Sequence, residues 1–76
     1  MKGILESIIL NIVDDKNSVS IAEREEENTT IFEIKVAEAD MGRVIGKQGK
    51  IAKSIRTIMK SVATREKKKV VVKFVE

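Results

Sequence analysis

Two glycines three residues apart, Gly46 and Gly49, separate two stretches of helical periodicity in this chain. Residues 49–64 give the clearer helix, because at about 100° per residue their apolar side chains fall within one arc. The arc holds Ile51, Ala52, Ile55, Ile58, Met59, Val62 and Ala63, and the complementary face holds Lys50, Lys53, Arg56 and Lys60. Residues 38–45 predict a shorter helix before the glycines, with Asp40 near its start. The fold must therefore contain a tight corner between two helices.

The rest of the chain supplies one more helix and three strands. Residues 2–14 repeat aliphatic side chains at helical spacing. Residues 18–27 and 29–37 alternate apolar and polar side chains, which predicts a β-hairpin with an acidic tip. Residues 70–75 are rich in β-branched side chains and predict a final strand. The resulting order, α-β-β-α-α-β, predicts one α+β domain over residues 1–76, a three-stranded sheet with the helices packed on one face.

The composition excludes several kinds of chemistry. The chain of 76 residues has no cysteine and no histidine, so disulfides, the usual zinc ligand sets, thiol catalysis and a histidine base are all absent. No Walker-type phosphate loop is present, and the hydroxyl side chains have no histidine partner. We expect a non-enzymatic protein without metal or cofactor. Polar residues interrupt the first apolar stretch, and no apolar run approaches the roughly 18 residues of a membrane span. We therefore expect a soluble, cytoplasmic protein.

Charge is divided unevenly between the two halves of the chain. Residues 1–40 hold four basic and ten acidic side chains, a net charge of −6. Residues 41–76 hold eleven basic and two acidic side chains, a net charge of +9. A polyanion would be drawn to the second half. A solvated basic surface would show the same charge distribution, so charge alone does not assign a function.

The segment Gly46-Lys47-Gln48-Gly49 has the properties of a phosphate-binding loop. Its glycines permit a tight connection with positive φ, and without side chains there a phosphodiester can approach the backbone N–H groups. The positive end of the following helix points to the same place, and Lys47 and Lys50 add positive charge. Such a loop binds an anion without reading base identity. A helix–turn–helix corner that needs glycine only for its backbone angles is the structural alternative.

Base recognition would have to come from a neighbouring groove. Its apolar floor is expected to include Ile45 and residues of the second strand. The chain has two phenylalanines and neither tyrosine nor tryptophan, which disfavours recognition by aromatic stacking. Arg43, one helical turn before the loop, is a candidate phosphate contact. Lys53 and Arg56 are candidates to extend the phosphate track, with an ordinary solvated helix face as the alternative.

The sequence run that carries the strongest resemblance is Met41-Gly42-Arg43-Val44-Ile45-Gly46-Lys47-Gln48-Gly49-Lys50, followed by the helix that contains Ile55. The run resembles the KH-domain signature, V-I-G-x-x-G. The element order resembles the type II arrangement of the KH fold. Almost the whole chain is similar to the small bacterial RNA-binding proteins of the KhpA type, which consist of a single KH domain.

The resemblance implies non-catalytic binding of single-stranded RNA in the cytoplasm, and with it an RNA chaperone role. By position, it implies that Gly46, Lys47, Gln48 and Gly49 contact the phosphates. It also implies a homodimer, or pairing with a larger KH protein of the Jag type.

A second function class stays open at this point. The KH fold would then serve as a protein-interaction subunit, docking through the first helix and Leu10, which lies off the apolar stripe. Binding of duplex DNA by a helix–turn–helix is a weaker third interpretation. The helix predicted over residues 49–64 would have to read the bases, and its start offers no base-reading side chain beyond Gln48. The turn from Arg65 to Lys69 is interpreted as solvated rather than as a binding site, and the pattern leaves open whether it takes part in binding.

Overall fold

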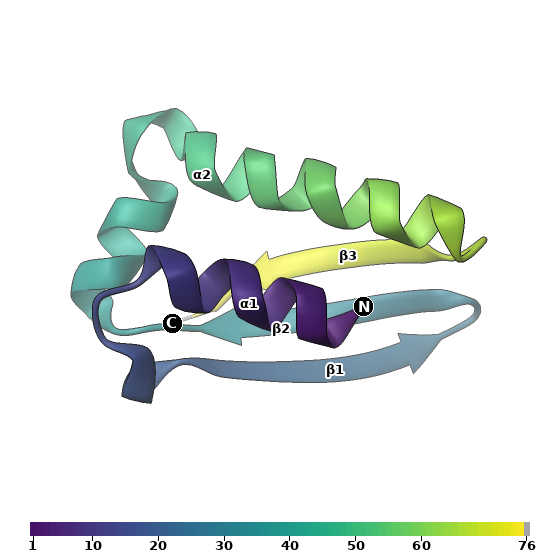
Figure 1. Ribbon diagram of the computed structural model, residues 1–76, viewed down its shortest axis with the longest axis horizontal. Helices are drawn as coiled ribbons and strands as arrows, with labels where there is room; N and C mark the ends of the chain where they lie inside the picture. Colours follow the sequence, from purple (N-terminus) through teal and green to yellow (C-terminus); the bar gives the residue numbers. More distant parts are fainter. Residues whose placement is uncertain (76) are drawn as a thin grey trace.

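The computed structural model describes residues 1–75, except for the side chain of Lys47. Its elements are α1 (Lys2–Ile12), the short 3₁₀ helix η1 (Lys16–Ser18), β1 (Ser20–Glu26), β2 (Thr29–Lys35), α2 (Glu38–Arg65) and β3 (Lys69–Phe74). Both helices that were predicted around the two glycines lie within α2, in two parts that meet at a sharp bend (Figure 1). The predicted order α-β-β-α-α-β is thereby confirmed. Within residues 1–75, no helix is long and apolar enough to cross a membrane.

The three strands form one sheet in the order β1-β2-β3. β1 and β2 are antiparallel and are joined by the two-residue turn Glu27-Asn28, whose φ angles of 46° and 65° match the turns that favour hairpins. β2 and β3 are parallel, because α2 carries the chain back along the sheet before β3 begins. The central strand is therefore β2, which holds most of the buried residues of the sheet.

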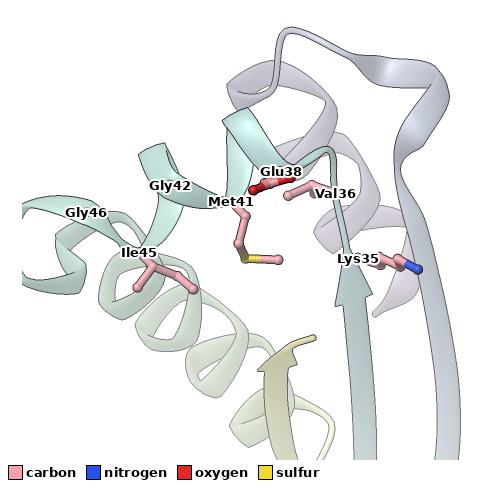
Figure 2. A pocket seen from close by; sticks show the side chains of 7 residues that line it. All are labelled: Lys35, Val36, Glu38, Met41, Gly42, Ile45 and Gly46. Atoms are coloured by element: carbon pink, nitrogen blue, oxygen red, sulfur yellow. The ribbon is translucent and has the colours of Figure 1, made fainter. Parts of the chain in front are cut away.

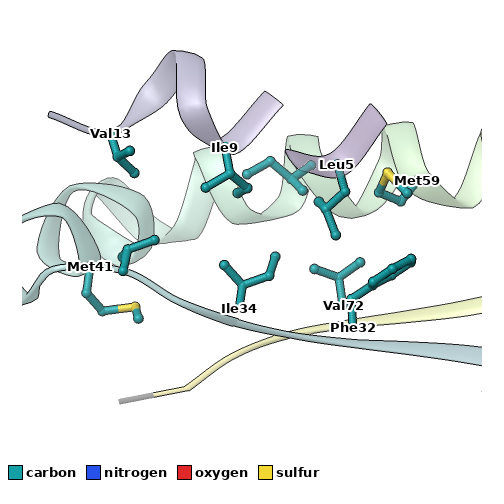
Figure 3. Packing of buried hydrophobic residues seen from close by; sticks show 10 residues of the cluster. Leu5, Ile9, Val13, Phe32, Ile34, Met41, Met59 and Val72 are labelled. Atoms are coloured by element: carbon teal, nitrogen blue, oxygen red, sulfur yellow. The ribbon is translucent and has the colours of Figure 1, made fainter. Parts of the chain in front are cut away.

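The core lies between the sheet and the two helices, which cover the same face (Figure 3). α1 contributes side chains spaced four residues apart, Leu5 and Ile9, both fully buried. β2 contributes Phe32 and Ile34 from alternate positions. The full cluster of buried residues is Leu5, Ile9, Val13, Phe32, Ile34, Val36, Met41, Ile55, Met59 and Val72. The periodicities of the sequence therefore correspond to the faces that are buried, except at Ile4 and Ile58, which belong to the predicted apolar stripes but are exposed.

α1 ends two residues earlier than its apolar pattern predicts. Val13 is still buried but its backbone is extended, with φ −84° and ψ 152°. The N–H groups of Asp14 and Asp15 donate to the two carboxylate oxygens of Asp40, each at 3.0 Å. These tertiary hydrogen bonds replace the last helical ones. The connection then continues through η1, and for that reason β1 begins at Ser20 rather than at residue 18.

The end of α2 is closed by hydrogen bonds of the kind that terminate helices. Lys67 has a positive φ of 57°, and its N–H donates to the carbonyl of Thr64 at 3.1 Å. The N–H of Lys68 donates to the carbonyl of Ala63 at 2.9 Å. This is the Schellman arrangement, with lysine where glycine is commoner. It reverses the chain into β3.

Candidate nucleic-acid interface

The bend in α2 is produced by two consecutive residues in the left-handed region. Gln48 has a φ of 63° and Gly49 a φ of 71°. Gly46 keeps a φ outside the left-handed region, so the break predicted over residues 46–49 is concentrated at its second half. Regular helical geometry resumes after Gly49, and the start of this second part of α2 brings backbone N–H groups and positive dipole ends to the bend. The corner can therefore receive an anion.

A groove lies beside the bend, with a volume of about 780 Å³ (Figure 2). One side is the end of β2 and the residue after it, and the other side is the first part of α2. The lining residues are Lys35, Val36, Glu38, Met41, Gly42, Ile45 and Gly46. Ile45 leaves 50% of its surface exposed. The groove, as defined by these seven residues, is thus mainly apolar and open to solvent.

Asp40 fixes the helix that forms one wall of the groove. Its side chain is buried, and its carboxylate accepts the N–H groups of Asp14 and Asp15. These two backbone donors hold the pKa of the Asp40 carboxyl below its ordinary value. A buried, ionised carboxylate with two N–H partners resists displacement. The first part of α2 is therefore anchored to the connection that follows α1.

The predicted site residues Arg43 and Arg56 both make contacts within the protein. Arg43 Nη2 lies 2.8 Å from Asp14 Oδ2, and its Nη1 donates to the Ile12 carbonyl at 3.3 Å. Arg56 Nε donates to the Val72 carbonyl at 3.2 Å, and its guanidinium carbon lies 6.0 Å from the centre of the Phe74 ring. Val72 belongs to the outer strand β3, so Arg56 covers part of that open edge. Each guanidinium retains further N–H groups, since arginine carries five.

The remaining predicted residues surround the bend. Lys50 and Lys53 are exposed, and neither forms an ion pair with any residue that the structure describes. Gln48 is exposed, and Gly46 lies both in the bend segment and in the wall of the groove. The side chain of Lys47 lies outside the described part of the structure. The backbone of the bend, the side chains of Lys50 and Lys53 and the groove therefore lie at one end of the molecule.

The basic turn Arg65 to Lys69 lies at the other end. Lys68 Nζ is 2.9 Å from Glu25 Oε1, which raises the pKa of the lysine through this hydrogen bond and ion pair. Lys69 N–H donates to the Asn28 carbonyl in the hairpin turn at 3.2 Å. Figure 1 shows the hairpin turn and the bend of α2 at opposite ends of the long axis of the molecule. The acidic side chains of β1 therefore lie near the turn from Arg65 to Lys69 and not near the bend of α2.

Sequence reasoning missed part of the groove. It expected Ile45 and residues of the second strand in the floor, whereas Glu38, Met41 and Gly42 were not assigned to it. Their spacing was the available signal, because residues four apart along a helix share a face. Glu38, Gly42 and Gly46 form one such row, and Met41 and Ile45 form the next. Within the part of the chain described here, no group of three acidic side chains is placed to hold a metal ion.

Comparisons with known proteins agree on one relationship. The family model described as KhpA/KhpB, KH domain matches residues 2–74. RNA-binding protein KhpA of Clostridium acetobutylicum is 49% identical over 75 residues, covering 99% of this chain and 100% of the relative. The protein of the same name from Chlamydia trachomatis is 42% identical over 76 residues, 100% of this chain and 97% of the relative. That from Aquifex aeolicus is 40% identical with 100% and 96% covered. No solved structure matches the chain.

Proposed function

Because the chain belongs to the KhpA/KhpB KH-domain family, we propose that it binds single-stranded RNA without catalysing a reaction. The bend at residues 46–49 holds the phosphate backbone, and the groove receives unpaired bases. One observation carries this proposal: Gly46 lines the groove and lies two residues before Gln48, where the bend begins, so a strand held at the bend would continue directly into an apolar surface.

The two parts of this surface suit the two parts of a nucleotide. The bend offers backbone N–H groups, the start of a helical segment and nearby lysines, which together attract phosphate. The groove offers Val36, Met41 and Ile45 to the faces of bases, and the polar side chains of Lys35 and Glu38 to their edges. The acidic residues of β1 gather near the hairpin turn, where they repel a polyanion from the opposite end.

Self-association belongs to the same proposal. A domain that contacts a few nucleotides binds weakly, and a second KH domain raises the effective concentration of the first. We therefore expect a homodimer, or a complex with a larger KH protein, in the cytoplasm and with an RNA chaperone role. Sedimentation that shows only monomer up to high micromolar concentration would contradict the homodimer.

The proposal is tested by reversing charge at the bend. Lys47→Glu with Lys50→Glu changes the net charge by the same amount as Lys67→Glu with Lys69→Glu at the opposite end. Fluorescence anisotropy with a mixed pool of single-stranded RNA oligomers measures the affinity of both variants and of the native protein. Circular dichroism establishes that each is folded. We expect the bend variant to bind at least about tenfold more weakly, and the control to lose much less.

Salt dependence provides a second measurement on the native protein. With three or four phosphates contacted, the slope of log affinity against log salt is expected near −2 to −3, at roughly 0.7 per phosphate for single strands. A folded bend variant that binds like the native protein, or a slope near zero, would show that the bend is not the binding site.

A further inference from the structure

The second part of α2 carries a row of basic side chains that leads away from the bend. Lys53, Arg56 and Lys60 are three and four residues apart, the spacing that places side chains next to one another on a helix surface. All three are exposed, and we call them the basic row. From Gly49 to Lys60 the helix rises by about 16 Å, at about 1.5 Å per residue. The basic row therefore extends the positive surface of the bend along the molecule.

The charge of the basic row is not neutralised by neighbouring carboxylates. Residues 49–65 and 69–74, which form the second part of α2 and β3, contain no acidic side chain. No member of the row forms an ion pair with a residue that the structure describes. By contrast, Arg24, Arg43 and Lys68 are each paired with an aspartate or a glutamate. Within the described residues, the basic row is therefore the part of the positive surface that remains available to an anion from outside the chain.

Arg56 is oriented by neutral groups. Its Nε donates to the Val72 carbonyl at 3.2 Å, and its guanidinium carbon lies 6.0 Å from the centre of the Phe74 ring. These contacts fix the guanidinium without reducing its charge. An oriented arginine fork is well suited to bind a phosphate through two parallel hydrogen bonds. Figure 1 shows the second part of α2 alongside β3, so a phosphate bound there would lie at the edge of the sheet opposite the acidic strand β1.

We propose that the basic row is a second RNA-contact surface, which binds the phosphates of nucleotides next to those held at the bend. This inference rests on the proposed function and lengthens the RNA site along α2. A strand held at the bend lies beside Lys50, and Lys53 follows one helical turn further on. The next phosphates of the same strand then meet Arg56 and Lys60. Contacts to phosphates carry no sequence information, so this surface adds affinity and length to the site without selecting bases.

The surroundings of the basic row favour RNA over an acidic protein surface. Protein interfaces have a core from which charged side chains are depleted. The basic row instead surrounds Thr57, an exposed polar residue whose hydroxyl donates to the Lys53 carbonyl at 3.0 Å. Ile58 is 44% exposed, but it lies two residues after Arg56 and thus on a different face of the helix. A chain of phosphates matches a narrow row of cations that has no apolar centre.

RNA oligomers of two lengths test the inference. A single strand of about four nucleotides fills the bend and the groove, whereas one of about twelve also reaches the basic row. Fluorescence anisotropy measures the affinity of the native protein and of Lys60→Glu for both. We expect Lys60→Glu to bind the long oligomer about three- to fivefold more weakly and to reduce the magnitude of its salt slope by about 0.7, the value for one phosphate. Its affinity for the short oligomer should be unchanged.

Salt and two further variants separate a contact from a general effect of charge. At about 0.1 M salt the Debye length is about 10 Å, which screens residue 60 from a phosphate at the bend. Lys2→Glu is the matched control, since Lys2 is also an exposed helical lysine but belongs to α1. Adding Arg56→Gln to Lys60→Glu should increase the loss on the long oligomer to about tenfold. Circular dichroism and urea unfolding establish that each variant is folded, and Lys60→Glu alone keeps the test valid because Lys60 is exposed.

Three results would overturn the inference. The first is native affinity of Lys60→Glu for the long oligomer while the Lys47→Glu, Lys50→Glu variant loses binding. The proposed function then stands, and a change in sedimentation of Lys60→Glu would assign the basic row to a protein partner. The second is an equal loss on the short and the long oligomer, and the third is an equal loss in Lys2→Glu; both would indicate a general effect of charge. A native protein that binds neither oligomer would overturn the proposed function as well.

Discussion

The guanidinium of Arg43 is held by Asp14, with 2.8 Å between Nη2 and Oδ2. Asp40, three residues before Arg43 in α2, accepts the backbone N–H groups of Asp14 and Asp15. Both contacts join the first part of α2 to the connection between α1 and β1. The wall of the groove is thus fixed to this connection. Arg43 has been predicted to contact phosphate, and its ion pair with Asp14 competes with that role.

Asp14→Asn is expected to raise RNA affinity about two- to threefold, since it removes the carboxylate that occupies Arg43. Asp15→Asn makes the same change in net charge and leaves the Arg43 partner in place, so it is the control. Anisotropy at one fixed salt concentration compares the two variants with the native protein. Equal affinities for the two variants would show that Arg43 has no phosphate contact to gain.

Asp40→Asn should make the stability of the protein less dependent on pH. The pKa of this carboxyl is lowered in the folded protein, so its ionisation stabilises the fold above the ordinary value and this contribution disappears as the pH falls. At pH 7 we expect the variant to unfold at a lower urea concentration than the native protein. As the pH falls below the ordinary range of an aspartate carboxyl and the native carboxylate takes up its proton, the gap should narrow. A gap that stays constant from pH 7 down to the acid unfolding of the native protein would contradict the stabilising role of the charge.

Ile9→Val and Ile4→Val delete one methylene group from two positions of α1 that differ in burial. Ile9 is fully buried and Ile4 is 46% exposed. We expect Ile9→Val to lower the free energy of unfolding by about 0.5–1.5 kcal/mol, because it removes buried surface and leaves a cavity. The change for Ile4→Val should stay within about 0.5 kcal/mol. Urea denaturation measures both, and similar losses at the two positions would indicate that Ile4 is covered, as by a second copy of the chain.

Gly49→Ala and Gly46→Ala should shift stability in opposite directions although the two glycines lie in the same bend. Gly49 has a φ of 71°, where a Cβ costs roughly 1–2 kcal/mol. Gly46 has helical surroundings and space for a Cβ, so alanine there should stabilise the protein by up to about 1 kcal/mol. Thermal unfolding of the two variants provides the measurement. A stabilised Gly49→Ala protein would show that the left-handed geometry is not maintained in solution.

Periodicity identified the elements because it reports local geometry. The stripe of α1 and the alternation of β2 each depend only on how many residues make one repeat, and the buried residues Leu5, Ile9, Phe32 and Ile34 fall where those repeats place them. The Gly46 to Gly49 segment was recognisable for the same reason, since glycine marks the positions where a helix can turn. Exact ends were less predictable: α1 stops at Ile12 because Asp40, far along the chain, accepts the next N–H groups.

The sequence by itself thus determined the order of the elements, their buried faces and the segment that bends. Only the tertiary structure decided that β2 is the central strand and that β3 runs parallel to it. It also decided that Arg43 and Arg56 contact Asp14 and Val72, and that Glu38, Met41 and Gly42 share one groove. Local patterns arise from residues a few positions apart, whose relative placement is set by helix or strand geometry. Contacts between segments depend on how the whole chain packs, and no local pattern encodes them.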